Sequence, residues 1–119
     1  MILLAADLLK LLRGDSAPNK LLEAIERGAV ISVISLYELV RGLPHIRIAK
    51  LKTTLESYGV RVIDFDLGLV LATERFCHEP INMELAVAFA LSSRERLELL
   101  TGAPQEIPNQ LKSDRILSL

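Results

Sequence analysis

The chain has 119 residues, with 14 lysines and arginines against 15 aspartates and glutamates, and a formal net charge of -1. This length fits one domain and leaves no room for a second. The near-neutral charge excludes a global positive field toward nucleic acid, so RNA binding would need a local basic patch or a bound metal. Half of the residues are hydrophobic and only 4% are aromatic, so the core must be built from Leu, Ile, Val and Ala.

Short apolar runs alternate with helix-like patterns through the first half of the chain. They predict strands at residues 2–5 and 30–34 and helices at residues 7–12, 20–27, 36–40 and 46–58. Gly28 and Gly59 each follow an amphipathic stretch and are expected to end the helix before them. The first half therefore predicts two strands, each followed by two helical segments.

The second half continues this alternation. It predicts strands at residues 60–65, 97–100 and 116–119, helices at residues 67–76 and 83–96, and a proline-punctuated loop at residues 102–115. Asp66 and Asn82 stand where they can cap the two helices. Strands alternating with helices predict a three-layer α/β domain, in which a central, mostly parallel sheet of four to five strands has helices on both faces. We expect residues 1–119 to form this single domain.

Three acidic residues fall where such a fold would gather a site. Asp7 follows the first expected strand, Glu38 lies one turn into the helix after the second, and Glu84 lies in the first turn of a later helix. In open α/β sheets, sites form at the carboxyl edge of the strands. Carboxylates from separate elements suit Mg²⁺ or Mn²⁺, which can activate water and polarise a phosphodiester. Taken singly, however, each acid is more simply a surface charge that stabilises a helix dipole.

Four segments carry a pattern that extends over the whole chain. They read MILLAADLLKLLRG at residues 1–14, ISVISLYELVRG at 31–42, PINMELAVAFAL at 80–91 and LELLT at 97–101. In this order they resemble the motifs of the PIN-domain family, to which VapC-like toxin ribonucleases belong. The resemblance implies a PIN fold, a Mg²⁺- or Mn²⁺-dependent endoribonuclease activity and a place in a toxin–antitoxin pair. It also puts Glu38 at the position of the family's glutamate.

The acidic positions of that family are only partly kept. The first acid falls on Ala5, and Asp7 matches the third position of the same motif. Glu84 stands where an aspartate is usual. In the fourth motif the family's next acid falls on Ala103, and a further one falls on Glu106.

The resemblance and these departures together define the expected site. Glu38, Glu84 and Asp7 are the candidate catalytic residues, and the same three with Glu106 are the candidate metal ligands. With two acidic positions replaced by alanine, we expect Mg²⁺ or Mn²⁺ to be held weakly or not at all. The first hypothesis is therefore a PIN-like protein with lost or weakened nuclease activity and a binding role. The alternatives are an active endoribonuclease toxin and an unrelated α/β interaction module whose acids only cap helices.

The remaining expectations concern partners and location. The apolar composition and the resemblance favour a homodimer, with an antitoxin-like protein or RNA as possible partners. Cys77 is the single cysteine, so no internal disulfide can form and a reducing, cytoplasmic location is expected. No basic, apolar leader opens the chain and no apolar run approaches about 20 residues, so neither a signal peptide nor a membrane span is expected.

Arginines are the remaining candidates for nucleic-acid contacts. A phosphate-binding edge could be lined by Arg13, Arg41, Arg47, Arg94 and Arg96. Dispersed, solvated side chains are the simpler interpretation, given the near-neutral total charge.

Overall fold

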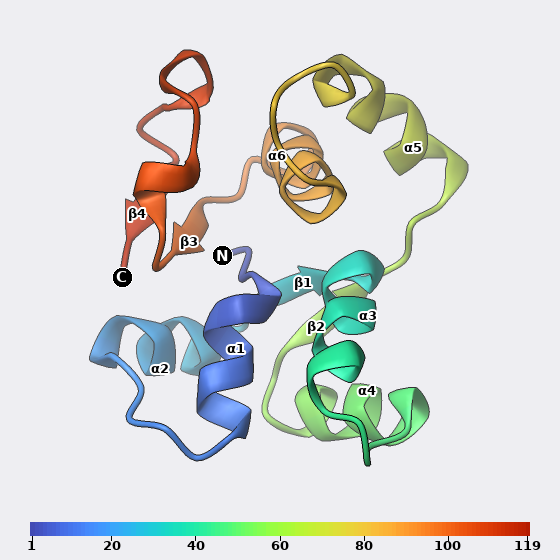
Figure 1. Ribbon diagram of the computed structural model, residues 1–119, viewed down its shortest axis with the longest axis vertical. Helices are drawn as coiled ribbons and strands as arrows, with labels where there is room; N and C mark the ends of the chain where they lie inside the picture. The colour runs from blue at the N-terminus through green and yellow to red at the C-terminus, as the bar shows by residue number, and fades with distance from the viewer.

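The computed structural model describes residues 1–119 as an α/β domain of six helices, four short strands and three single turns of 3₁₀ helix (Figure 1). The helices are α1 (Ala5–Leu12), α2 (Asn19–Glu26), α3 (Val33–Gly42), α4 (Ile48–Ser57), α5 (Leu67–Thr73) and α6 (Met83–Glu95). The strands are β1 (Val30–Ser32), β2 (Arg61–Ile63), β3 (Leu99–Thr101) and β4 (Ile116–Ser118). The 3₁₀ turns are η1 (Glu74–Phe76), η2 (Pro104–Glu106) and η3 (Asn109–Leu111).

The strands form two parallel pairs, β1 with β2 and β3 with β4. The expected central sheet of four to five strands is thus wrong. The N-terminal segment lies between the two pairs (Figure 1), but it contributes only Ile2, which makes one parallel bridge to Val30 and another to Leu99. The reason is that α1 begins at Ala5, two residues earlier than expected, so the helix takes over the end of the expected strand at residues 2–5.

Successive strand residues point to opposite sides and build two separate cores. Ile2, Val30 and Leu99 belong to a core formed mainly with α5 and α6. Leu3, Ile31 and Leu100, each one residue further on, belong to a second core with α1, α2, α3 and α4. Figure 1 shows the same division, with α5 and α6 on one side of the strands and α1, α2 and α4 on the other. The expected placement of helices on both sides is confirmed.

Local capping explains where several helices begin. The side chains of Asp66 and Asn82 accept hydrogen bonds from the third amide of α5 and α6, at 2.9 and 2.8 Å, which confirms both predicted caps. Ser32 does the same for α3, so β1 ends at that residue and the next helix follows directly. By contrast, Leu4 precedes α1 and offers no side-chain cap.

The expected loop at residues 102–115 contains the two 3₁₀ turns η2 and η3. Its prolines mark both turns, since Pro104 begins η2 and Pro108 directly precedes η3. None of the helices combines the length and the apolar character needed to cross a bilayer.

Candidate functional site

Glu38 and Glu84 line one open hollow of about 580 Å³ between α3 and the start of α6. Glu38 comes from the middle of α3, and Glu84 follows the Asn82 cap of α6. The other lining residues are Ile34, Tyr37, Arg41, Asn82 and Met83. The structure therefore brings two of the four expected site residues together.

The carboxylate of Glu84 has a specific partner within the fold. Its Oε2 accepts a hydrogen bond of 2.7 Å from the backbone N–H of Ala5, 79 residues away in the chain. That N–H is the first of α1, one of the helix N-terminal amides that have no partner within the helix. Because Leu4 provides no side-chain cap, Glu84 supplies from α6 the acceptor and the negative charge that the start of α1 needs.

The carboxylate of Glu38 is engaged on its own helix. Arg41 Nη1 donates to both carboxylate oxygens of Glu38 at 3.3 Å. The Glu38 side chain is 39% exposed and the Arg41 side chain is 63% exposed. Such exposed pairs contribute little to stability because water screens them. Glu38 is consequently the more available of the two acids in this hollow.

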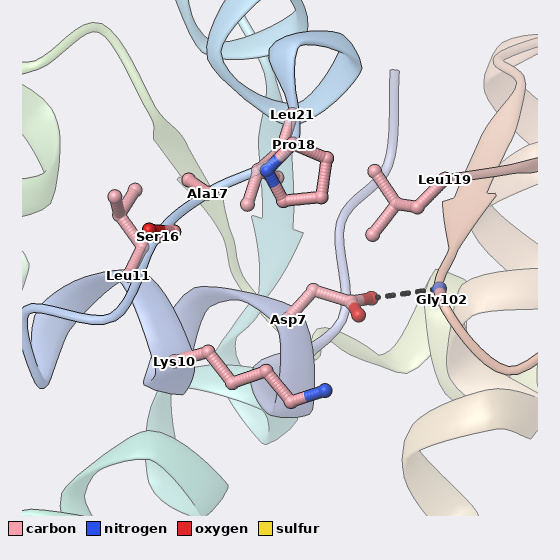
Figure 2. A pocket seen from close by; sticks show the side chains of 9 residues that line it. All are labelled: Asp7, Lys10, Leu11, Ser16, Ala17, Pro18, Leu21, Gly102 and Leu119. Atoms are coloured by element: carbon pink, nitrogen blue, oxygen red, sulfur yellow. Dashed lines mark hydrogen bonds between the residues drawn. The ribbon is translucent and has the colours of Figure 1, made fainter.

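Asp7 lies in a different pocket, of about 230 Å³, between α1, the start of α2 and the end of β3 (Figure 2). Its side chain is 9% exposed, and its Oδ2 accepts a hydrogen bond of 3.4 Å from the N–H of Gly102. In Figure 2 the carboxylate points toward Gly102, with Leu119 above Gly102 and Pro18 at the top of the pocket. Burial raises the pKa of Asp7, while the Gly102 bond and the charge of Lys10 partly oppose that rise.

Glu106 and Ala5, two further positions singled out from the sequence, do not complete an acidic centre. Glu106 ends η2 on the exposed surface and lines neither the hollow of Glu38 and Glu84 nor the pocket of Asp7. Ala5 is 6% exposed and packs in the core with α1 to α4. A carboxylate at Ala5 would therefore enter an apolar environment, where an unpaired charge is costly.

The acids expected to hold Mg²⁺ or Mn²⁺ lie in separate surroundings, Glu38 and Glu84 in one hollow and Asp7 in another pocket. No three of the aspartates, glutamates, histidines and the cysteine gather around one point. A divalent ion of this kind takes oxygen ligands in octahedral geometry, through one or two carboxylates together with waters and substrate phosphates. Here the two carboxylates of the hollow are already engaged, one by the Ala5 amide and the other by Arg41.

Some residues of the hollow were not expected from sequence. Tyr37 and Met83 are 55% and 54% exposed although both side chains are large and apolar in part. Each directly precedes one of the two glutamates, and that adjacency is the signal that could have identified them. Arg41, expected to be one of several dispersed and solvated arginines, is exposed and also pairs with Glu38.

No protein-family model matches this chain, and no curated protein matches it.

Proposed function

We propose that this protein is a PIN-like domain that binds a protein partner and has lost metal-dependent nuclease activity. The observation that carries the proposal is the hydrogen bond between Glu84 Oε2 and the Ala5 N–H. It gives the acid at the third motif a structural task at the start of α1. A carboxylate held there has one oxygen committed, which leaves it less able to coordinate an ion.

The surroundings of Ala5 and Asp7 support the same proposal. Ala5 occupies the position of the family's first acid, and it packs among apolar side chains. Asp7 is bonded to Gly102 in a pocket of its own. A nuclease with water-rich metal coordination depends on several negative charges close together, and this chain distributes its acids over separate surroundings.

The partner surface would be the hollow between α3 and α6. Tyr37 and Met83 give it exposed aromatic and thioether surface, which is typical of the centre of protein interfaces. Glu38 and Glu84 give it two carboxylates against the single cation of Arg41. This charge disfavours the phosphates of RNA and favours a protein segment that carries apolar and basic side chains, as an antitoxin-like partner could.

The first test is a calorimetric titration of Mn²⁺ into the purified protein, with Glu38→Gln as the matched control, followed by incubation of the protein with RNA and Mn²⁺. We expect no saturable heat at millimolar metal and no cleavage. Saturable binding that Glu38→Gln abolishes, together with cleavage of RNA, would overturn the proposal.

A metal-dependent endoribonuclease is the second candidate function. The fact that favours it is that Glu38 and Glu84 line the same hollow. The titration above separates the two functions, because only a nuclease requires both metal binding and its loss in the Glu38→Gln variant.

We also propose that the protein is a homodimer in a reducing, cytoplasmic compartment. The support for a dimer is an exposed apolar face on α5, where Leu67, Val70 and Leu71 are 72%, 41% and 61% exposed. These residues lie one turn apart on one side of the helix. Size-exclusion chromatography with light scattering should give twice the monomer mass at micromolar concentration, and Leu71→Glu should give the monomer. A monomeric wild-type protein would refute the dimer.

The reducing compartment is supported by Cys77, a free and exposed thiol.

A further inference from the structure

Another hollow, of about 350 Å³, lies between the end of α6, η1 and the segment that leads into β4. Three basic side chains line it: Arg75 of η1, and Lys112 and Arg115 of the loop before β4. Ser93 and Ser113 add exposed hydroxyl groups, and no aspartate or glutamate lines the hollow. We call this the basic hollow.

The lining of the basic hollow carries only positive charge. The protein has 14 lysines and arginines against 15 acidic residues, yet three cations gather here. The ion pairs of the fold involve Arg41, Lys52 and Arg94, so none of the three cations of the basic hollow takes part in one. Glu74 directly precedes Arg75 in η1, and Glu79 lies at the edge of the hollow, where its carboxylate accepts a hydrogen bond of 3.3 Å from Gln110. The exposed Asp114 lies in the same loop.

Both arginines are held in place by the fold. The guanidinium of Arg75 lies 5.3 Å from the ring centroid of Phe76, and that ring in turn stacks on Phe89 at 5.6 Å. Arg115 Nη1 donates to the carbonyl of Ser92 at 3.1 Å. A guanidinium has five N–H donors, so Arg115 keeps most of them free after this bond. Positioning before binding reduces the entropy that a ligand contact must overcome.

The contact of Arg115 with Ser92 also has a purely structural role. Ser92 is in the last turn of α6, and a cation there balances the negative end of the helix dipole. One arginine suffices for that role. It does not explain Arg75, which is held by Phe76, or Lys112, which makes no side-chain hydrogen bond to the helix. With the helix end already neutralised by Arg115, the other two cations and the hydroxyls are available to an anion.

We propose that the basic hollow binds a phosphate group. Two guanidinium groups, an ammonium and two hydroxyls match the several acceptor oxygens and the double negative charge of a phosphate, and arginine forks suit its geometry. The hollow is open and large enough for the phosphate to be either the free ion or a monoester on a small molecule. This site is independent of the proposed function, because it shares no residue with the hollow of Glu38 and Glu84.

The test is an NMR titration of the full ¹⁵N-labelled chain with sodium phosphate and, separately, with glycerol phosphate, at constant ionic strength. We expect saturable shifts at the amides of residues 92, 93 and 112–115 and at the side chain of Arg75, with a dissociation constant of about 1 mM or tighter. Tighter binding of glycerol phosphate would identify a monoester as the ligand, and equal binding would identify the free ion.

The variant for this test is Arg75→Gln with Lys112→Gln, two exposed positions, with the Lys112→Gln single variant as a second measurement. Loss of two charge-assisted contacts should weaken binding at least about tenfold. The matched control is Arg47→Gln with Lys50→Gln, which removes the same charge around the start of α4, at the opposite end of the fold in Figure 1. Because salt screens charges beyond about 10 Å, the control should bind within about twofold of wild type. Absence of saturable shifts, or equal weakening by both pairs, would overturn the proposal.

Discussion

Replacement of Glu84 by alanine tests whether this acid stabilises the fold or is kept for another purpose. The variant removes the acceptor of the 2.7 Å hydrogen bond and leaves the N–H of Ala5 without a partner, in a residue that is only 6% exposed. A hydrogen bond to a charged group contributes about 1.5–3 kcal/mol. The lost charge in the first turn of α6 adds about 0.3–1 kcal/mol. We therefore expect a loss of about 2–4 kcal/mol in the free energy of unfolding.

Two matched variants separate the hydrogen bond from the charge. Glu84→Gln keeps a side-chain oxygen that can accept from Ala5 and should lose about half as much, because a neutral acceptor forms a weaker bond. Glu38→Ala removes the other acid of the same hollow, whose pair with Arg41 is exposed, and should lose no more than about 0.5 kcal/mol. The expected order of stability is Glu38→Ala, then Glu84→Gln, then Glu84→Ala.

Urea unfolding followed by circular dichroism measures these differences. With a slope of about 2 kcal/mol per molar urea, typical of a domain this small, Glu84→Ala should lower the midpoint by about 1–2 M. Hydrogen exchange at the Ala5 amide should accelerate in that variant and not in Glu38→Ala. If Glu84→Ala is as stable as wild type or more so, the reasoning is refuted. Relief of repulsion between poised metal ligands would produce that result.

Three further perturbations test the rest of the fold. Asp7→Asn should be more stable than wild type above the usual carboxyl pKa near 3.8, and as stable as wild type below that pH. Burial raises the pKa of Asp7 in the folded protein, so wild-type stability falls as the pH rises from the usual carboxyl pKa through the raised one. A gain in stability that does not change with pH in urea titrations would contradict this. Gly102→Ala should cost about 1–3 kcal/mol, since the new Cβ would meet Asp7 Oδ1 at 2.7 Å, and Asp7→Ala in the same chain should restore much of it. Asn82→Ala should cost about 1 kcal/mol by thermal unfolding, through loss of the 2.8 Å cap to Leu85, and an unchanged midpoint would show the cap to be redundant.

Most elements could be predicted from sequence because their signals are local. A capping side chain is within three residues of the amide that it binds, so Asp66 and Asn82 located the starts of α5 and α6 from the sequence. Gly28 and Gly59 each follow the C-cap residue of α2 and α4 and adopt positive φ angles of 90°, a conformation that glycine reaches without strain. Hydrophobic periodicity then supplied the faces that are buried.

The first strand failed because its apolar run is compatible with either structure. Residues 2–5 are hydrophobic, and a short apolar run does not distinguish a buried strand from a buried helix. The start of α1 at Ala5 depends on an acceptor that comes from Glu84, in a helix 79 residues later. No local pattern could reveal that contact.

The sequence by itself therefore determined the alternation of helices and strands and the positions of two caps. The tertiary structure alone decided which polar side chains share a surface. It brought Glu38 and Glu84 to one hollow, sent Asp7 to Gly102, and gathered Arg75, Lys112 and Arg115 at another. The physical reason is that capping and periodicity act within one or two turns, whereas sites are assembled from residues far apart in the chain.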